Sequence, residues 1–158
     1  MKIYKVTVIF LILLVLPFAV IAQSDLNMQL LKAVKQNDSV TVQLLLNLGA
    51  DVNSCDTNGA SVLMWAAYKS DLDMVKYLVD YGADYKKKWV IYLENQGGYY
   101  GNLTGMAAGE GKLNVLKFFI EECKVPVDDK EWNPYDKAET GWTALQWACY
   151  KSSLKIAK

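Results

Sequence analysis

Few side chains in this sequence could carry out chemistry. The chain has no histidine, and all 17 of its basic residues are lysine, balanced by 17 acidic residues. Without histidine, Ser-His and Cys-His nucleophiles and the imidazole ligands of most catalytic zinc sites are excluded. Without arginine, the planar fork of donors that reads phosphate and guanine is absent, and the balanced charge provides no basic surface. We therefore expect neither histidine-based catalysis nor a nucleic-acid partner.

Carboxylates are the remaining candidates for acid–base or metal chemistry. Asp71 can cap a helix, and Asp73 would lie in its first turn, where a negative charge suits the helix dipole. The cluster of Asp128, Asp129 and Glu131 could contact calcium, but it lacks the alternating acidic loop and closing glutamate of a dedicated site. A hydrolase that uses paired acids remains a hypothesis, although no pair has orienting partners. The sequence therefore predicts no catalytic residue, no cofactor and no metal ion.

The most regular stretch predicts two short helices joined by a turn. Ser61 is placed to cap the first helix and Asp71 the second, and Gly82 suits a left-handed C-terminal cap. The second helix carries an apolar stripe at helical spacing, made of Leu72, Val75, Leu78 and Val79. Helices of about two turns cannot shield such a stripe alone, so the unit needs stacked copies of itself.

Copies of this unit recur along the chain. Residues 47–51 (NLGAD) precede residues 80–84 (DYGAD) by 33 positions. Each copy has a small residue where a neighbouring helix can approach closely, and these residues are Ala33, Ala66, Ala107 and Ala148. Steps of 33, 41 and 41 residues separate them. Such self-similarity is typical of an array in which every unit packs on its neighbours.

The pattern resembles the ankyrin repeat. The T-P-L-H-x-A signature of that family is matched at residues 61–66 and more closely at residues 141–148. The resemblance covers nearly everything after residue 25. It implies an all-α solenoid of stacked helix-turn-helix units with extended β-hairpin-like fingers, used as a binding scaffold, and it implies no particular partner.

Residues 1–22 are predicted to be a signal peptide, and residues 23–158 the ankyrin-repeat domain. Lys2 and Lys5 give a positive start, an apolar run follows, and the small residues that end at Ala22 suggest cleavage before Gln23. The alternative is an uncleaved membrane anchor over residues 6–22. In both cases the repeats would lie outside the cytoplasm, secreted or periplasmic, as in an exported ankyrin-repeat protein of the bacterial type.

Four repeats are expected, at about residues 24–55, 56–85, 86–128 and 129–158. The opening repeat should be atypical, with Lys32 and Lys35 facing water. The third contains an insertion of about eight residues in which a hairpin is predicted. The segment that begins at Asn102 departs from the family signature, which leaves the register of that helix open. The fourth repeat is incomplete, because its second helix would begin near Ser153.

Three cysteines in an exported chain raise the question of a disulfide. Cys55 follows repeat one and Cys123 follows repeat three, while Cys149 lies inside repeat four. Helices of neighbouring repeats pack about 8–10 Å apart. Two repeats of separation exceed the roughly 7 Å limit between bridged α-carbons. We expect Cys149 to be buried in place of an alanine and the other two to be unpaired; a redox-active thiol is the alternative.

Aromatic residues outside the helix stripes are the candidates for binding. Tyrosine and tryptophan supply contact area at low entropy cost, and the fingers and first helices line the concave face of this architecture. The alternative is that these rings pack on one another and hold the fingers together. Residues that follow the small pairs should face the same groove. The predicted partner-binding residues are Tyr68, Lys69, Trp89, Tyr92, Tyr99, Tyr100, Glu110, Trp132, Tyr135, Trp142, Tyr150 and Lys151.

These features predict a non-catalytic module that binds another exported protein through its concave face and aromatic fingers. The alternative is a protein that binds glycans or peptidoglycan fragments by stacking the same rings on sugar faces.

Overall fold

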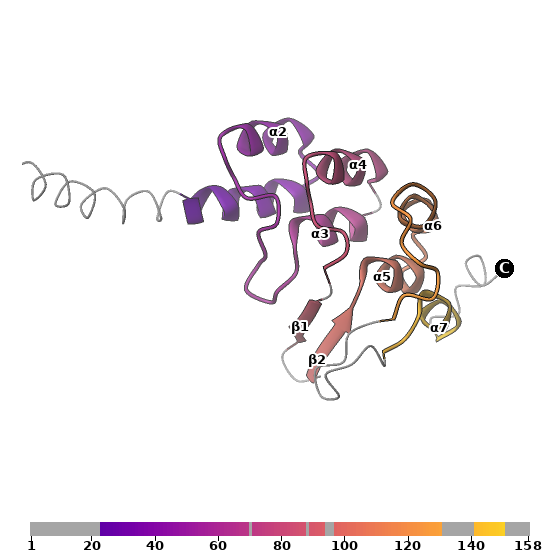
Figure 1. The fold of residues 1–158 in the computed structure, drawn as a ribbon. Helices are drawn as coiled ribbons and strands as arrows, with labels where there is room; N and C mark the ends of the chain where they lie inside the picture. The colour runs from indigo at the N-terminus through magenta and orange to yellow at the C-terminus, as the bar shows by residue number, and fades with distance from the viewer. Residues whose placement is uncertain (1–22, 70, 88, 94–96, 131–140, 151–158) are drawn as a thin grey trace, which may run out of the picture.

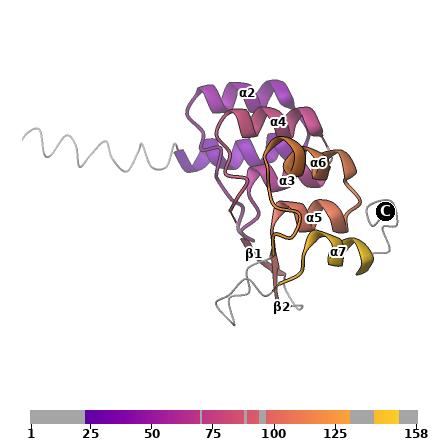
Figure 2. The ribbon, with the colours of Figure 1, turned by 45° about the vertical axis from the view of Figure 1, so that its right-hand side comes forward.

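Helices in two layers make up the body of the protein (Figures 1 and 2). The computed structural model describes residues 23–69, 71–87, 89–93, 97–130 and 141–150, and only the backbone of 89–93 and 97–100. The predicted leader, its cleavage site and the second helix predicted near Ser153 lie outside these residues. No helix within the described ranges is long and apolar enough to cross a membrane.

The two layers follow from the helix pairs of the repeats. The first layer contains the first helix of each repeat, and the second layer contains the second helices (Figure 2). The first layer consists of a helix over residues 23–35, α3 (Val62–Lys69), α5 (Leu103–Gly109) and α7 (Ala144–Tyr150). The second layer consists of α2 (Ser39–Asn47), α4 (Leu72–Asp80) and α6 (Leu113–Lys117), which continues as a π-helix, η1 (Phe118–Glu122).

Small residues let the first helices approach one another, as the sequence predicts. Ala33, Ala66, Ala107 and Ala148 lie at like places on four successive first helices, and each is at most 3% exposed. The second helices bury their apolar stripe against this layer, and Leu78 is completely buried. The repeat organisation is therefore confirmed in these parts of the chain.

Each first helix after the opening one begins at a polar cap in the same register. The hydroxyl of Ser61 accepts a hydrogen bond from the Met64 amide at 3.2 Å. Asn102 lies 41 positions later, and its side chain accepts from the Gly105 amide at 2.7 Å. Thr143 follows after another 41 positions and accepts from Gln146. Asn102 therefore replaces the hydroxyl cap, and the register of the third repeat is settled.

The segments between repeats, called fingers here, differ in length. The first finger, residues 51–61, is closed by a single bridge between Cys55 and Ser61. In the second finger, residues 84–101, strands β1 (Trp89–Leu93) and β2 (Gly97–Gly101) pair antiparallel, with Ile91 opposite Tyr99. Figure 1 shows the two strands of the insertion projecting away from the helices.

The opening repeat carries helix where the later repeats carry a finger. Its helix is described from residue 23, whereas the 33-residue step places the start of α3 opposite residue 29. Asn53 of the first finger accepts from the Asp84 amide at 2.8 Å and so links two repeats. In the opening repeat, Asn27 accepts from the Asp51 amide at 2.8 Å, and Gln23 donates to the Gly49 carbonyl at 2.8 Å. Two side chains of the opening helix thus make the hydrogen bonds that a finger makes between the later repeats.

The burial predicted for Cys149 is wrong. Ala67 and Ala108, its counterparts in repeats two and three, are 0% exposed, but Cys149 is exposed. A second helix and a following repeat cover those two alanines, and no described element lies over α7 in the same way. Leu145 is 56% exposed for the same reason.

Replacing Leu78 with alanine tests the stacking. Leu78→Ala should lower the free energy of unfolding by about 2–5 kcal/mol, because it removes buried contacts and leaves a cavity between repeats. Urea denaturation followed by circular dichroism measures the loss. Leu44→Ala is the control, since Leu44 is 57% exposed, and it should change stability by no more than about 0.5 kcal/mol. Equal effects of the two changes would contradict the packing.

Candidate partner-binding groove

A groove of about 720 Å³ lies between the opening helix and the first finger. Asn27, Met28 and Lys32 line the helix side, and Ser54 and Thr57 line the finger side. Met28 is 65% exposed although it is apolar. Ser24, Asn27 and Met28 line it from the helical extension, residues 23–28, and residues within 31–36 complete that wall. Of the predicted partner-binding residues whose side chains the structure describes, none lines this groove.

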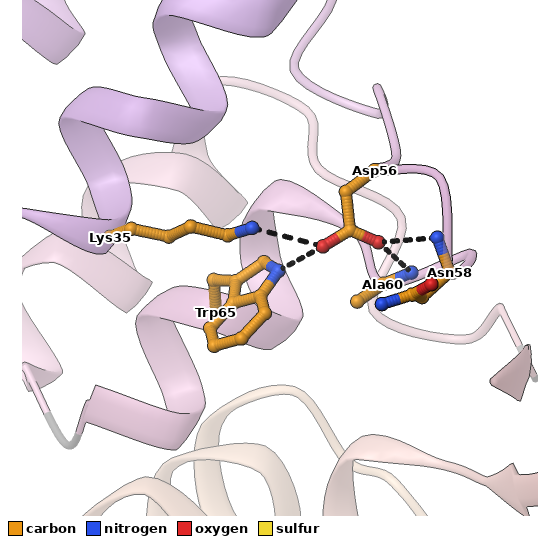
Figure 3. A network of polar contacts seen from close by, with 5 residues as sticks. All are labelled: Lys35, Asp56, Asn58, Ala60 and Trp65. Carbon is orange, nitrogen blue, oxygen red and sulfur yellow. Dashed lines mark hydrogen bonds and ion pairs between the residues drawn. The ribbon is translucent and has the colours of Figure 1, made fainter. Parts of the chain in front are cut away.

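One carboxylate fixes the finger wall of this groove (Figure 3). Asp56 Oδ2 accepts from Lys35 Nζ at 3.0 Å and from the indole Nε1 of Trp65 at 2.9 Å. Its Oδ1 accepts from the backbone amides of Asn58 and Ala60, each at 3.0 Å. The four bonds connect the opening helix, the finger and α3. The finger is therefore held in place by repeats one and two together.

The same contacts set the charge of Asp56. Burial is the largest single influence and favours the neutral acid, but the hydrogen bonds from Lys35, Trp65, Ala60 and Asn58 together outweigh it. The net effect lowers the pKa of Asp56 below its ordinary value of 3.8. Asp56 therefore stays ionised at neutral pH and keeps its attraction for Lys35.

The sequence predicts that Lys35 faces water, but in the structure its charged end is paired with Asp56. Its side chain is 39% exposed, and its Nζ lies 4.2 Å from the centroid of the Trp65 ring while it pairs with Asp56. A cation in this position gains from the ring and from the carboxylate at once. Lys35 is thus a structural link at the end of the groove, whereas Lys32 remains exposed.

The structure places one group of the predicted partner-binding residues at the ends of the first helices. Tyr68 is 43% exposed, packs edge-on against Trp65 at 5.9 Å, and lies 5.8 Å from Lys112 Nζ. Lys69 is exposed beside it, and Glu110 is exposed at the end of α5. These residues share one rim of the first-helix layer. They do not line the groove between the opening helix and the first finger.

The other predicted partner-binding residues divide into three sets. Trp142 and Tyr150 lie 5.0 Å apart, each also packs against Trp147, and they are 40% and 66% exposed, so packing and exposure coexist there. The second set has its backbone in β1 and β2, and it comprises Trp89, Tyr92, Tyr99 and Tyr100. The third set lies outside the described residues, and it comprises Trp132, Tyr135 and Lys151.

Sequence reasoning missed the helix wall of the groove. Asn27 and Met28 do not belong to the apolar stripe and match no family motif, so no pattern marked them. The available signal was the lack of a turn-and-glycine segment before repeat one, which leaves residues 23–28 free to extend the helix. An exposed methionine and an amide on the same extension then face the finger.

The described residues contain no candidate metal centre. No three cysteine, aspartate or glutamate side chains there gather closely enough to hold a metal ion. Cys55, Cys123 and Cys149 are free thiols. Burial, followed by the negative charges of Glu122 and Asp80, raises the pKa of Cys123 and disfavours its reactive thiolate.

A family model for ankyrin repeats, built from three copies, matches residues 11–89, half of the 158-residue chain. The chain is 42% identical over 59 residues to the palmitoyltransferase AKR1 of Saccharomyces cerevisiae, which is 37% of this chain and 8% of that protein.

Longer but weaker likenesses cover most of the chain. It is 30% identical over 125 residues to the E3 ubiquitin-protein ligase hecd-1 of Caenorhabditis elegans, covering 78% of this chain and 4% of the ligase. It is also 30% identical over 129 residues to an ankyrin repeat and KH domain-containing protein of Caenorhabditis briggsae, covering 81% of this chain and 5% of that protein. The chain thus spans only a small part of each relative, and the likeness concerns a repeat segment.

Removing the Asp56 carboxylate should loosen the finger in a pH-dependent way. Asp56→Ala leaves two backbone amides, an indole N–H and Lys35 without their acceptor, and it should cost about 1–3 kcal/mol of unfolding free energy at neutral pH. Because the folded-state pKa lies below 3.8, the contribution is complete above that value and is lost as the pH falls through the folded pKa.

Urea denaturation from neutral pH down to about pH 2, followed by tryptophan fluorescence, measures this difference. The wild type and Asp56→Ala should converge at the acid end. Asp128→Ala, at an exposed carboxylate, is the control and should follow the wild type throughout. A constant gap between wild type and Asp56→Ala at every pH would show that the carboxylate charge has no part in holding the finger.

Proposed function

We propose that this chain, which belongs to the ankyrin-repeat family, is a non-catalytic module that binds another exported protein through the concave face of its array. Ankyrin repeats generally mediate protein–protein interaction. The groove beside the opening helix is the primary contact surface in this proposal, and the rim at Tyr68 and Lys69 continues it.

The groove between the opening helix and the first finger is the observation that carries this proposal. Its finger wall is held by the four bonds to Asp56, so little ordering is needed when a partner arrives. Met28 offers an exposed, adaptable apolar contact, and Lys32 offers an exposed cation one turn later. The Ser54 hydroxyl is buried at the groove without a hydrogen-bond partner among the described residues. This combination suits a protein segment that presents an apolar side chain next to a carboxylate.

Export is proposed from the sequence of residues 1–22. A short positive start, an apolar run and a small-residue end are typical of a signal peptide that is removed. The partner would then be an exported protein too, and retention of residues 6–22 as an anchor would leave the repeats on the same side of the membrane.

Changing the helix wall of the groove should weaken partner capture. The double variant Met28→Glu and Lys32→Glu removes an apolar contact and reverses a charge, which should weaken binding by roughly tenfold or more. The measurement is quantitative mass spectrometry of proteins retained from an extracytoplasmic extract, followed by titration of the retained partner.

The matched control is the double variant Leu44→Glu and Lys117→Glu. It makes the same chemical changes at exposed positions on α2 and α6, in the other layer. The control should retain the partner at the wild-type level. If the groove variant also retains it, and its circular dichroism is unchanged, the contact lies elsewhere on the molecule.

The leader has its own test. Expression of the full chain in a bacterial host, followed by N-terminal sequencing of the periplasmic product, should give a protein that begins at Gln23 because the signal peptidase cleaves after a small residue. A full-length product in the membrane fraction would support the anchor. A full-length product in the cytoplasm would contradict export.

A further inference from the structure

A second cleft lies on the finger side of repeat three, away from the groove. Its volume is about 440 Å³, within the range of small-molecule sites. It is formed by the start of the second finger and by the loop that follows η1. Tyr85 and Lys86 line it from the finger, and Lys124 and Val125 line it from the loop.

Lys124 holds an unusual backbone conformation beside this cleft. Its φ is +58°, in the left-handed region that favours glycine. The second helices of repeats one and two end with Gly49 and Gly82 at the same position, with φ of +95° and +104°. Repeat three places a lysine where the geometry favours glycine. Glycine serves the same turn in both other repeats, so the turn itself does not require a lysine.

The π-helix η1 produces this placement. A step of 41 residues from Gly82, the turn residue of repeat two, leads to Cys123, but the turn residue of repeat three is Lys124. The second helix of repeat three is therefore one residue longer than that of repeat two. The extra residue is absorbed as a wide turn, with the Cys123 amide bonded to the Phe118 carbonyl at 3.1 Å. Such single π turns often accompany functional sites. Here the insertion brings a lysine to the edge of the cleft.

Two cations without an ion-pair partner among the described residues and one aromatic ring line the cleft. Neither Lys86 nor Lys124 forms an ion pair with any residue that the structure describes. Asp129, the acidic residue of the lining, receives a 2.7 Å hydrogen bond from the Asn102 amide. Tyr85 is half-buried against the core, and Lys86 Nζ lies 5.7 Å from its ring centroid. A ligand here would meet a flat ring next to positive charge.

We propose that this cleft binds a saccharide unit that carries a carboxylate. The carboxylate would pair with Lys86 and Lys124, and the C–H face of the sugar would lie on Tyr85. A sugar acid combines in one small ring the apolar face and the anionic group that this lining offers. This binding is independent of the protein partner proposed above, because the two sites share no lining residue.

Titration of the folded chain with D-glucuronate, D-glucose and acetate, followed by NMR, tests the proposal. Glucuronate should perturb the amides around Tyr85 and Lys124 and bind at least about tenfold more tightly than either other compound, since only it has both carboxylate and ring. Equal binding of glucose would show that the lysines do not read the carboxylate. Equal binding of acetate would show an adventitious anion only, and no binding of glucuronate would also overturn the proposal.

Two glycine substitutions separate the role of the Lys124 side chain from its backbone strain. Lys124→Gly should leave the melting temperature unchanged or raise it, yet weaken glucuronate binding by about tenfold through loss of one charge-assisted contact. Asn37→Gly is the matched control, because Asn37 also has a positive φ, +59°, and lies outside the cleft. It should affect stability in the same direction and leave binding unchanged.

A variant on the other wall keeps the test independent of the turn. Lys86→Gln removes the second cation without touching the backbone of the loop and should also weaken glucuronate by about tenfold. Unchanged affinity in both Lys124→Gly and Lys86→Gln would overturn the assignment.

Discussion

Close contact between successive first helices is the interaction on which the rest of this molecule depends. Ala66 and Ala67 of α3 and Ala107 and Ala108 of α5 are at most 1% exposed. Alanine allows the two backbones to approach, loses no side-chain entropy on burial and favours the helix. The approach fixes the spacing of the repeats. It therefore fixes the distance between fingers and the width of every groove between a finger and a helix.

A second constraint acts on the first finger, residues 51–61, which is mostly polar. Its backbone groups need partners, and half-buried side chains supply some of them. Asn53 connects the first finger to the turn that follows α4, with its amide oxygen on Asp84 and its nitrogen 3.4 Å from the Gly82 carbonyl. Asp56 connects the same finger back to the opening helix. Helix stacking thus sets the spacing of the repeats, and polar side chains set the position of the first finger relative to the helices.

The sequence predicts what depends on periodicity and misses what depends on a neighbour. The buried alanine of each repeat, the caps at Ser61 and Asp71, and the glycine turn at Gly82 follow from local pattern, and the structure confirms them. Cys149 matches the pattern of a buried residue but is exposed, because burial depends on the element that packs over it. Lys35 looks like a solvated cation, and only the fold brings Trp65 and Asp56 to it.

Both proposed sites arise where a repeat departs from the pattern of the array. One wall of the groove includes helix that the opening repeat has in place of a finger, and the cleft is edged by a lysine in place of a glycine. The π turn was invisible in the sequence because one extra residue still leaves an apolar stripe, with Phe118 buried beside Phe119. A stable array does not need a lysine at the turn after η1, since Gly49 and Gly82 serve the same turn in the other repeats. The helical extension does have a structural role, because Gln23 and Asn27 bond to the turn that follows α2, but it also presents side chains that the regular repeats lack. Departures from a regular pattern are expected at functional sites, and this is the physical reason to propose function at these two places rather than along the regular helices.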